Sequence, residues 1–240
     1  MFKNKSAQSL ITEFLLIISG ILISLFVQSK FEERQQKAEG IKILNQIAND
    51  LMLDTALFSL NLKSAAYLME QYKMLLSKKG NIVKDLGMPS AVEGVLATDS
   101  KILTMINRGG YLRFTSFGQF EVYRQPELIN DILHYYNNQN EMLNSFTQWD
   151  TNYVKDQVVE YYLSHHTGNL RRYFEQNVLH DGPRQDDAMM MRQMLDDPDF
   201  QSLQAYNYII KMNYLGQLQE AREEAIKLLS KIQKYLPTAD

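Results

Sequence analysis

The chain has 240 residues, enough for one large domain or two small ones. Its 25 lysines and arginines against 28 aspartates and glutamates give a formal net charge of −3, so there is no basic excess and we exclude nucleic acid as a partner. The absence of cysteine excludes disulfides, zinc–thiolate sites and thiol catalysis.

The first feature along the chain is an apolar run. Residues 14–27 carry no charge, and with residues 10–13 they approach the ~20 residues that a spanning helix needs. The run leads into the helix-forming stretch 31–36, and no small-residue cleavage site follows it. We therefore predict a short tail at 1–9 and an uncleaved transmembrane helix at 10–29. The alternative, a buried soluble helix, is rarely apolar on every face.

Three residues of this span can form a contact between membrane helices. Glu13 is an acid near one end of the span, where it either snorkels to the interface or pairs with another group. Gly20 and Ser24 are small residues four apart, a spacing that lets two helix backbones approach closely. We predict a helix–helix contact through these three residues, with a second copy or other membrane proteins as partners within the lipid.

The same residues belong to a longer pattern. Glu13 is followed after seven residues by Gly-Ile-Leu-Ile-Ser-Leu at 20–25, then by Glu-Glu-Arg at 32–34 and Asp-Leu at 50–51. A second patch reads Phe-Gly at 117–118, then Pro-Glu-Leu at 126–128, Ile-Leu at 132–133 and Tyr-Tyr at 135–136. This pattern resembles a family of uncharacterised single-span bacterial membrane proteins of unknown function, although Lys30 stands where that family has tryptophan. The resemblance implies a single pass through the bacterial inner membrane and no particular activity.

Beyond the span the pattern is helical almost throughout, and no segment alternates like a strand. From Ile41 onward, apolar or small residues recur at steps of mostly three and four. This stripe comprises Leu44, Ala48, Leu51, Phe58, Leu62, Ala65, Met69, Tyr72 and Leu76. It predicts a long amphipathic helix that can continue the span. The stripe fits either a coiled coil between subunits or an intrachain bundle, and we favour the bundle.

Glycine and proline divide the rest of the chain. The run Lys-Lys-Gly-Asn at 78–81 ends the first helix, and a short helix at 99–107 is expected to end at the glycines that follow. Pro126 opens a second long helix that runs to about Leu163. Two further helices are predicted at 198–211 and 218–236. The fold class is therefore all-α: a transmembrane helix running into a long amphipathic helix, packed in an irregular helical bundle over 30–240.

No group of residues predicts a reaction. Glu160 with His165, His166 and His180 matches no metal motif, and the methionines at 189–191 spread around a helix as gap-filling residues do. The acid pairs lack a nucleophile or histidine at a useful spacing. We predict no catalytic residue, no metal, no cofactor and no enzymatic activity.

Aromatic residues give the best candidate for a binding surface. Phe114, Phe117, Phe120 and Tyr123 lie three apart in a glycine-flanked segment. Such residues anchor interfaces and line ligand pockets, although core packing is their commoner role.

Two classes of function remain. The first is a membrane-anchored helical interaction or scaffold protein, a subunit of a membrane assembly. The second is an extracytoplasmic small-ligand sensor domain that acts through a partner. We favour the first because so few residues precede the span that signalling across the membrane would need a partner's output domain.

The orientation of the span is argued from charge. Lys3 and Lys5 favour a cytoplasmic amino terminus, and the basic residues at 30–42 argue the reverse. Long domains translocate largely regardless of charge, so we favour an extracytoplasmic helical domain.

Overall fold

The computed structural model describes residues 7–78, 104–117, 125–161, 164 and 193–236. Within these residues every element of regular secondary structure is a helix, and no strand is present. The prediction of an all-α fold is confirmed.

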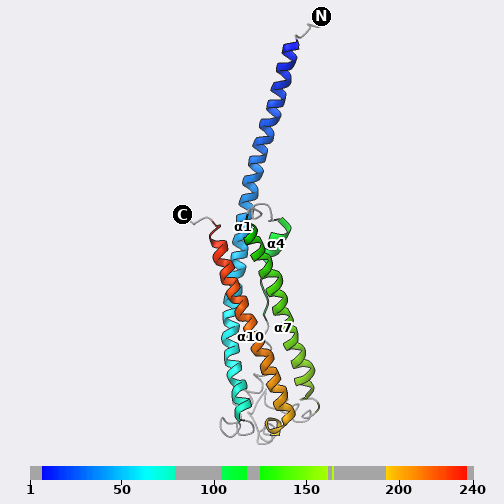
Figure 1. The fold of residues 1–240 in the computed structure, drawn as a ribbon, viewed down its shortest axis with the longest axis vertical. Coiled ribbons are helices and arrows are strands. Elements are labelled where there is room, and N and C mark those ends of the chain that lie inside the picture. The colour runs from blue at the N-terminus through cyan, green and yellow to red at the C-terminus, as the bar shows by residue number, and fades with distance from the viewer. Residues whose placement is uncertain (1–6, 79–103, 118–124, 162–163, 165–192, 237–240) are drawn as a thin grey trace, which may run out of the picture.

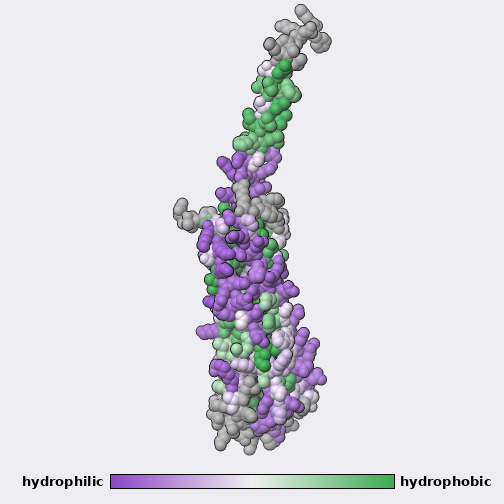
Figure 2. All heavy atoms as spheres, in the orientation of Figure 1, coloured by the Kyte–Doolittle hydropathy of each residue, from purple (hydrophilic) through white to green (hydrophobic). Residues whose placement is uncertain are grey.

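Helix α1 (Ala7–Lys78) is one unbroken element of 72 residues. Its first part projects alone from one end of the bundle (Figure 1), and every side chain from 11 to 30 is exposed. This part forms an apolar band that a hydrophilic stretch separates from the bundle (Figure 2). By length and composition α1 can cross a membrane once. From Gly40 onward, one face of the same helix is buried.

The remaining elements are shorter helices and one long one. They are α4 (Gly109–Phe117), α6 (Pro126–His134), η2 (Tyr135–Gln139), α7 (Asn140–Tyr153), η3 (Val154–Val158) and α10 (Pro198–Gln233). The elements η2 and η3 are π-helical turns, so α6 to η3 form one continuous rod. Proline at the first position opens both this rod and α10, because the fixed φ of proline suits a helix start. At the start of α10 the Asp197 carboxylate also accepts the Asp199 backbone N–H.

The bundle is built from α1, the α6–η3 rod and α10, with α4 against α1. Arg222 of α10 bonds Ser59 of α1 at 2.8 Å, and the rings of Tyr72 and Tyr208 lie 6.0 Å apart further along. In one direction along the bundle, residue numbers rise in α1 and fall in α10, so the two helices are antiparallel. The carboxyl end of α10 lies near the point where α1 leaves the bundle (Figure 1).

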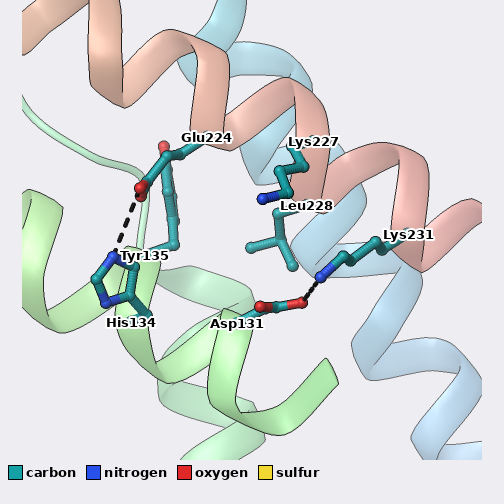
Figure 3. A pocket seen from close by; sticks show the side chains of 7 residues that line it. All are labelled: Asp131, His134, Tyr135, Glu224, Lys227, Leu228 and Lys231. Atoms are coloured by element: carbon teal, nitrogen blue, oxygen red, sulfur yellow. Dashed lines mark hydrogen bonds and ion pairs between the residues drawn. The ribbon is translucent and has the colours of Figure 1, made fainter. Parts of the chain in front are cut away.

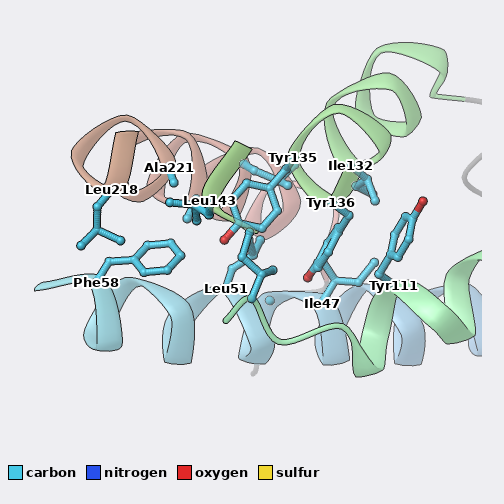
Figure 4. Packing of buried hydrophobic residues seen from close by; sticks show 14 of the residues in the cluster. Ile47, Leu51, Phe58, Tyr111, Ile132, Tyr135, Tyr136, Leu143, Leu218 and Ala221 are labelled. Atoms are coloured by element: carbon cyan, nitrogen blue, oxygen red, sulfur yellow. The ribbon is translucent and has the colours of Figure 1, made fainter. Parts of the chain in front are cut away.

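The core lies between these helices along the whole bundle. Figure 4 shows part of it, where Phe58 of α1 lies beside Leu218 of α10 and Tyr136 faces Tyr111. Fully burying a side chain such as Phe58 contributes roughly 1.5–3 kcal/mol. The stripe predicted along α1 is this buried face, since it includes Leu44, Ala48, Leu51, Phe58, Ala65, Met69 and Tyr72. The intrachain bundle was thus the better interpretation of that face.

The short helix predicted at 99–107 is wrong over the part that the structure describes. Residues 104–108 are not helical, and the helix begins at Gly109, where it was expected to end. The cause is a tertiary contact, because carboxylates of α1 accept the backbone N–H groups of Asn107 and Gly110 and hold this segment along α1.

The two helices predicted at 198–211 and 218–236 are one helix, α10. Tyr214 and Leu218 are both fully buried, so packing continues on either side of the supposed break. Gly216 lies between them on the exposed face, where its intrinsic cost of about 1 kcal/mol is too small to interrupt a packed helix.

Gly110 of α4 and Gly216 of α10 give a matched test of packing. A methyl group at Gly110 would lie 2.6 Å from the backbone nitrogen of Ile47, whereas at Gly216 it would meet nothing within 4 Å. We predict that Gly110→Ala lowers the free energy of unfolding by about 1–3 kcal/mol, because α4 must move away from α1. Gly216→Ala should raise it by roughly 0.5–1 kcal/mol. Chemical unfolding of the full-length protein in detergent measures both, and equal effects would contradict the close contact.

Candidate functional site

The three residues predicted for helix–helix contact lie on the projecting part of α1. Glu13, Gly20 and Ser24 are all exposed. A side chain added at Gly20 would meet nothing within 4 Å. Steps of seven and four place the three residues on one face of the helix, so this face is open to a neighbouring helix.

The predicted aromatic surface is placed only in part. Phe114 of α4 is fully buried in the core beside the residues that join α4 to α1. It therefore packs inward and does not form an exposed surface. The side chain of Phe117, and residues Phe120 and Tyr123, lie outside the described part of the structure, so a binding surface there stays a prediction.

A buried polar cluster joins three elements near the middle of the bundle. Asp54 of α1 is fully buried and accepts the Tyr135 hydroxyl at 2.9 Å. The same carboxylate accepts the backbone N–H of Asn107 at 2.9 Å and its side-chain amide at 2.6 Å. One turn earlier, Asp50 accepts the Gly110 backbone N–H at 2.6 Å. We call Asp50, Asp54, Asn107, Gly110 and Tyr135 the carboxylate cluster.

Burial controls the electrostatics of this cluster. Loss of water raises the pKa of the Asp54 carboxyl above its ordinary value of 3.8, and the hydrogen bonds from Asn107 and Tyr135 oppose that rise. Burial, with the nearby Asp54 charge, also raises the pKa of the Tyr135 phenol, which therefore remains a hydrogen-bond donor. The cluster thus holds three elements in register, and its groups already bond one another.

Tyr136 beside it has a different role. Its ring stacks on Tyr111 with centroids 4.6 Å apart and meets Tyr135 edge to face at 5.0 Å. Among the residues that the structure describes, its buried hydroxyl has no hydrogen-bond partner, so the ring stabilises α4 against η2 through packing.

A second buried polar contact joins α7 to α10. The Lys211 ammonium lies 2.7 Å from the Asp150 carboxylate, and both side chains are almost completely buried. Breaking such a pair by removing one partner commonly costs 3–5 kcal/mol, because a buried charge is left behind. Sequence reasoning missed this pair. The signal was Lys211 itself, a charged residue inside the apolar run 208–212.

An open cleft of about 200 Å³ lies between α6, η2 and α10. Two ion pairs cross it in Figure 3, Asp131–Lys231 and His134–Glu224, the second at 3.5 Å. Lys227, Leu228 and Tyr135 also line it. A small polar molecule could enter only by competing with these ion pairs.

No group of three or more potential metal ligands occurs among the residues that the structure describes. His165, His166, His180 and the methionines at 189–191 lie outside that part of the chain.

Comparison with known proteins gives no family assignment. No protein-family model, no curated protein and no solved structure matches this chain. The resemblance to single-span bacterial membrane proteins stays a prediction.

The raised pKa of Asp54 makes a testable contribution to stability. Because this pKa is higher in the folded than in the unfolded chain, the folded state binds the proton more tightly. The free energy of unfolding should therefore fall as pH rises from the ordinary value of 3.8 through the raised native pKa. Asp54→Asn cannot titrate, so we predict that the variant lacks this part of the pH dependence.

The measurement is chemical unfolding of both proteins in detergent from about pH 3.5 to pH 7.5, with the difference between the two curves as the readout. Other titrating groups contribute equally to both proteins and cancel in the difference. Parallel curves would show that the pKa of Asp54 does not differ between the folded and the unfolded chain.

Proposed function

We propose that this chain is a membrane-anchored helical interaction or scaffold protein and a subunit of a membrane assembly. The observation that carries the proposal is α1, which joins an exposed apolar segment to the core of a helical bundle without a break. Such a helix fixes the bundle at the membrane surface and presents an open helix face within the lipid. The buried charged groups of the described bundle support this role, because they join helices to one another and do not line the cleft between α6, η2 and α10.

The proposal places the protein in the bacterial inner membrane with a single pass and an extracytoplasmic bundle. The support is the amino-terminal charge, with Lys3 and Lys5 ahead of the span, and the weak dependence of long-domain translocation on flanking charge. The function assigned is non-enzymatic. Its partners are the lipid and other copies or other membrane proteins.

One observation favours a second candidate, a small-ligand sensor that acts through a partner. The cleft of Figure 3 lies between α6 and α10, and Tyr135, which lines it, bonds Asp54 of α1. A ligand that displaced the ion pairs would thereby contact the cluster that positions α1. Such a ligand would change the arrangement of the helices only if it bound two arrangements with different affinities.

Association of the span tests the first proposal. We predict that Glu13→Leu and Gly20→Leu each weaken self-association or partner association of the span about fivefold, matching a contact on the order of 1 kcal/mol between membrane helices. Leu22→Ala should have no effect, because Leu22 lies on the opposite face of the helix. A two-hybrid or crosslinking assay within membranes gives the measurement.

Resistance to alkaline carbonate extraction is the control for anchoring in every variant. Release by carbonate would contradict the anchor itself. If the native span does not associate, or if association survives both leucine variants, Glu13 is an interfacial residue and the proposed contact is wrong.

A further inference from the structure

The bundle leaves a regular row of large apolar side chains exposed on α1. Leu53, Leu60 and Tyr67 are 60%, 61% and 55% exposed, in a helix whose opposite face is almost completely buried. They follow one another at intervals of seven residues. We call these three residues the outer stripe of α1.

The outer stripe points directly away from the bundle. Leu60 shows this best, because its neighbours in the chain turn to the two flanks. Ser59 accepts a hydrogen bond from Arg222 of α10 at 2.8 Å on one side, and Asn61 donates to Thr104 at 2.9 Å on the other. Leu60 between them therefore faces outward, with its own bundle behind it.

The same face continues into the membrane segment. Ser24 and Leu60 are thirty-six residues apart, as are Gly20 and Ala56, and this separation is ten turns of an α-helix at 3.6 residues per turn. Because α1 is unbroken between them, the small residues of the span and the outer stripe lie along one side of the molecule. This side is exposed both in the span and in the bundle.

We propose that a second copy of this chain packs along this side, parallel and in register, so that the outer stripe of each copy meets that of the other. Two anchored copies have the same orientation in the membrane, so equivalent residues of α1 lie at equal depth. A seven-residue repeat is the spacing that keeps parallel helices in contact over several turns. This inference rests on the proposed function, because it assigns the partner and extends the span contact into the bundle.

The outer stripe is too small to hold two copies together by itself. From Leu53 to Tyr67 it covers only about 21 Å of helix, at 1.5 Å per residue. A stable interface buries about 800 Å² on each partner, which three side chains do not reach. The contact therefore depends on the span to hold two copies together and raise their effective concentration. Lys63 lies on the same face, and two copies in register would bring two of these positive charges near each other, which further limits the strength of the contact.

The absence of native cysteine makes the test clean. Leu60→Cys in the full-length protein, oxidised gently in native membranes, should form a covalent dimer in high yield. Met105→Cys is the matched control, since Met105 is 78% exposed and lies in the segment that flanks the other side of α1. It should stay monomeric.

A second measurement tests the same contact with the reporter cysteine at one end of the outer stripe, so that the other two residues can be changed. With Tyr67→Cys as the reporter, adding Leu53→Glu and Leu60→Glu should lower the dimer yield about tenfold, because like charges would meet across the interface. Leu112→Glu on α4 is the matched control. All these side chains are exposed, so the far-ultraviolet helical signal should not change.

Each outcome has one meaning. If Leu60→Cys stays monomeric while the native span still associates, the inference is overturned and the proposed function stands. If the span also fails to associate, both are overturned. A crosslinked product of the wrong mass for two copies would overturn the second copy as the partner.

Discussion

The rest of the structure depends on the continuity of α1. One helix of 72 residues provides the apolar segment that can cross a membrane, the hydrophilic stretch next to it and one wall of the core. A straight α-helix has a fixed rotation per residue, so the orientation of the bundle also fixes the direction in which each face of the apolar segment points. The contacts proposed within the membrane and the contacts in the bundle therefore belong to the same element.

The carboxylate cluster fixes how α1 packs within the bundle. Asp54 and Asp50 accept hydrogen bonds from the backbone N–H groups of residues 107 and 110, which would otherwise be left without partners beside the helix. Tyr135 brings the second long rod to the same carboxylate. An apolar stripe alone would tolerate sliding of the helices by one turn, whereas these directed bonds allow one register only. The exposed face of α1 follows from that register.

The sequence was most informative where one helix face is apolar throughout. The spacing of Leu44, Leu51 and Phe58 predicted the buried face of α1, and Pro126 predicted the start of the second rod. These features depend on local spacing and backbone geometry, so neighbouring residues are enough to identify them.

Tertiary contacts account for what could not be predicted. The helix starts at Gly109 because Asp50 and Asp54 of α1 lie opposite this segment. Asp50 bonds Gly110, sixty residues later in the chain, and Asp54 bonds Asn107, fifty-three residues later. Lys211 is buried because Asp150 on another helix neutralises it. Gly216 does not end α10 because burial on both sides outweighs its propensity. For the candidate site, the sequence predicted a contact at Gly20 and Ser24 that stays a prediction, and the outer stripe became visible only once the bundle showed which apolar residues it leaves exposed.

The most direct test of this account is the distance across the hydrophilic stretch of α1. Spin labels on Leu25→Cys and Lys42→Cys, in full-length protein diluted with unlabelled protein in lipid bilayers, should give one narrow distribution centred near the ~26 Å expected for seventeen residues of straight α-helix. A broad distribution, or one centred at a clearly different distance, would mean that α1 bends or unwinds between the membrane and the bundle. The orientation of the span would then be independent of the bundle, contrary to the central claim.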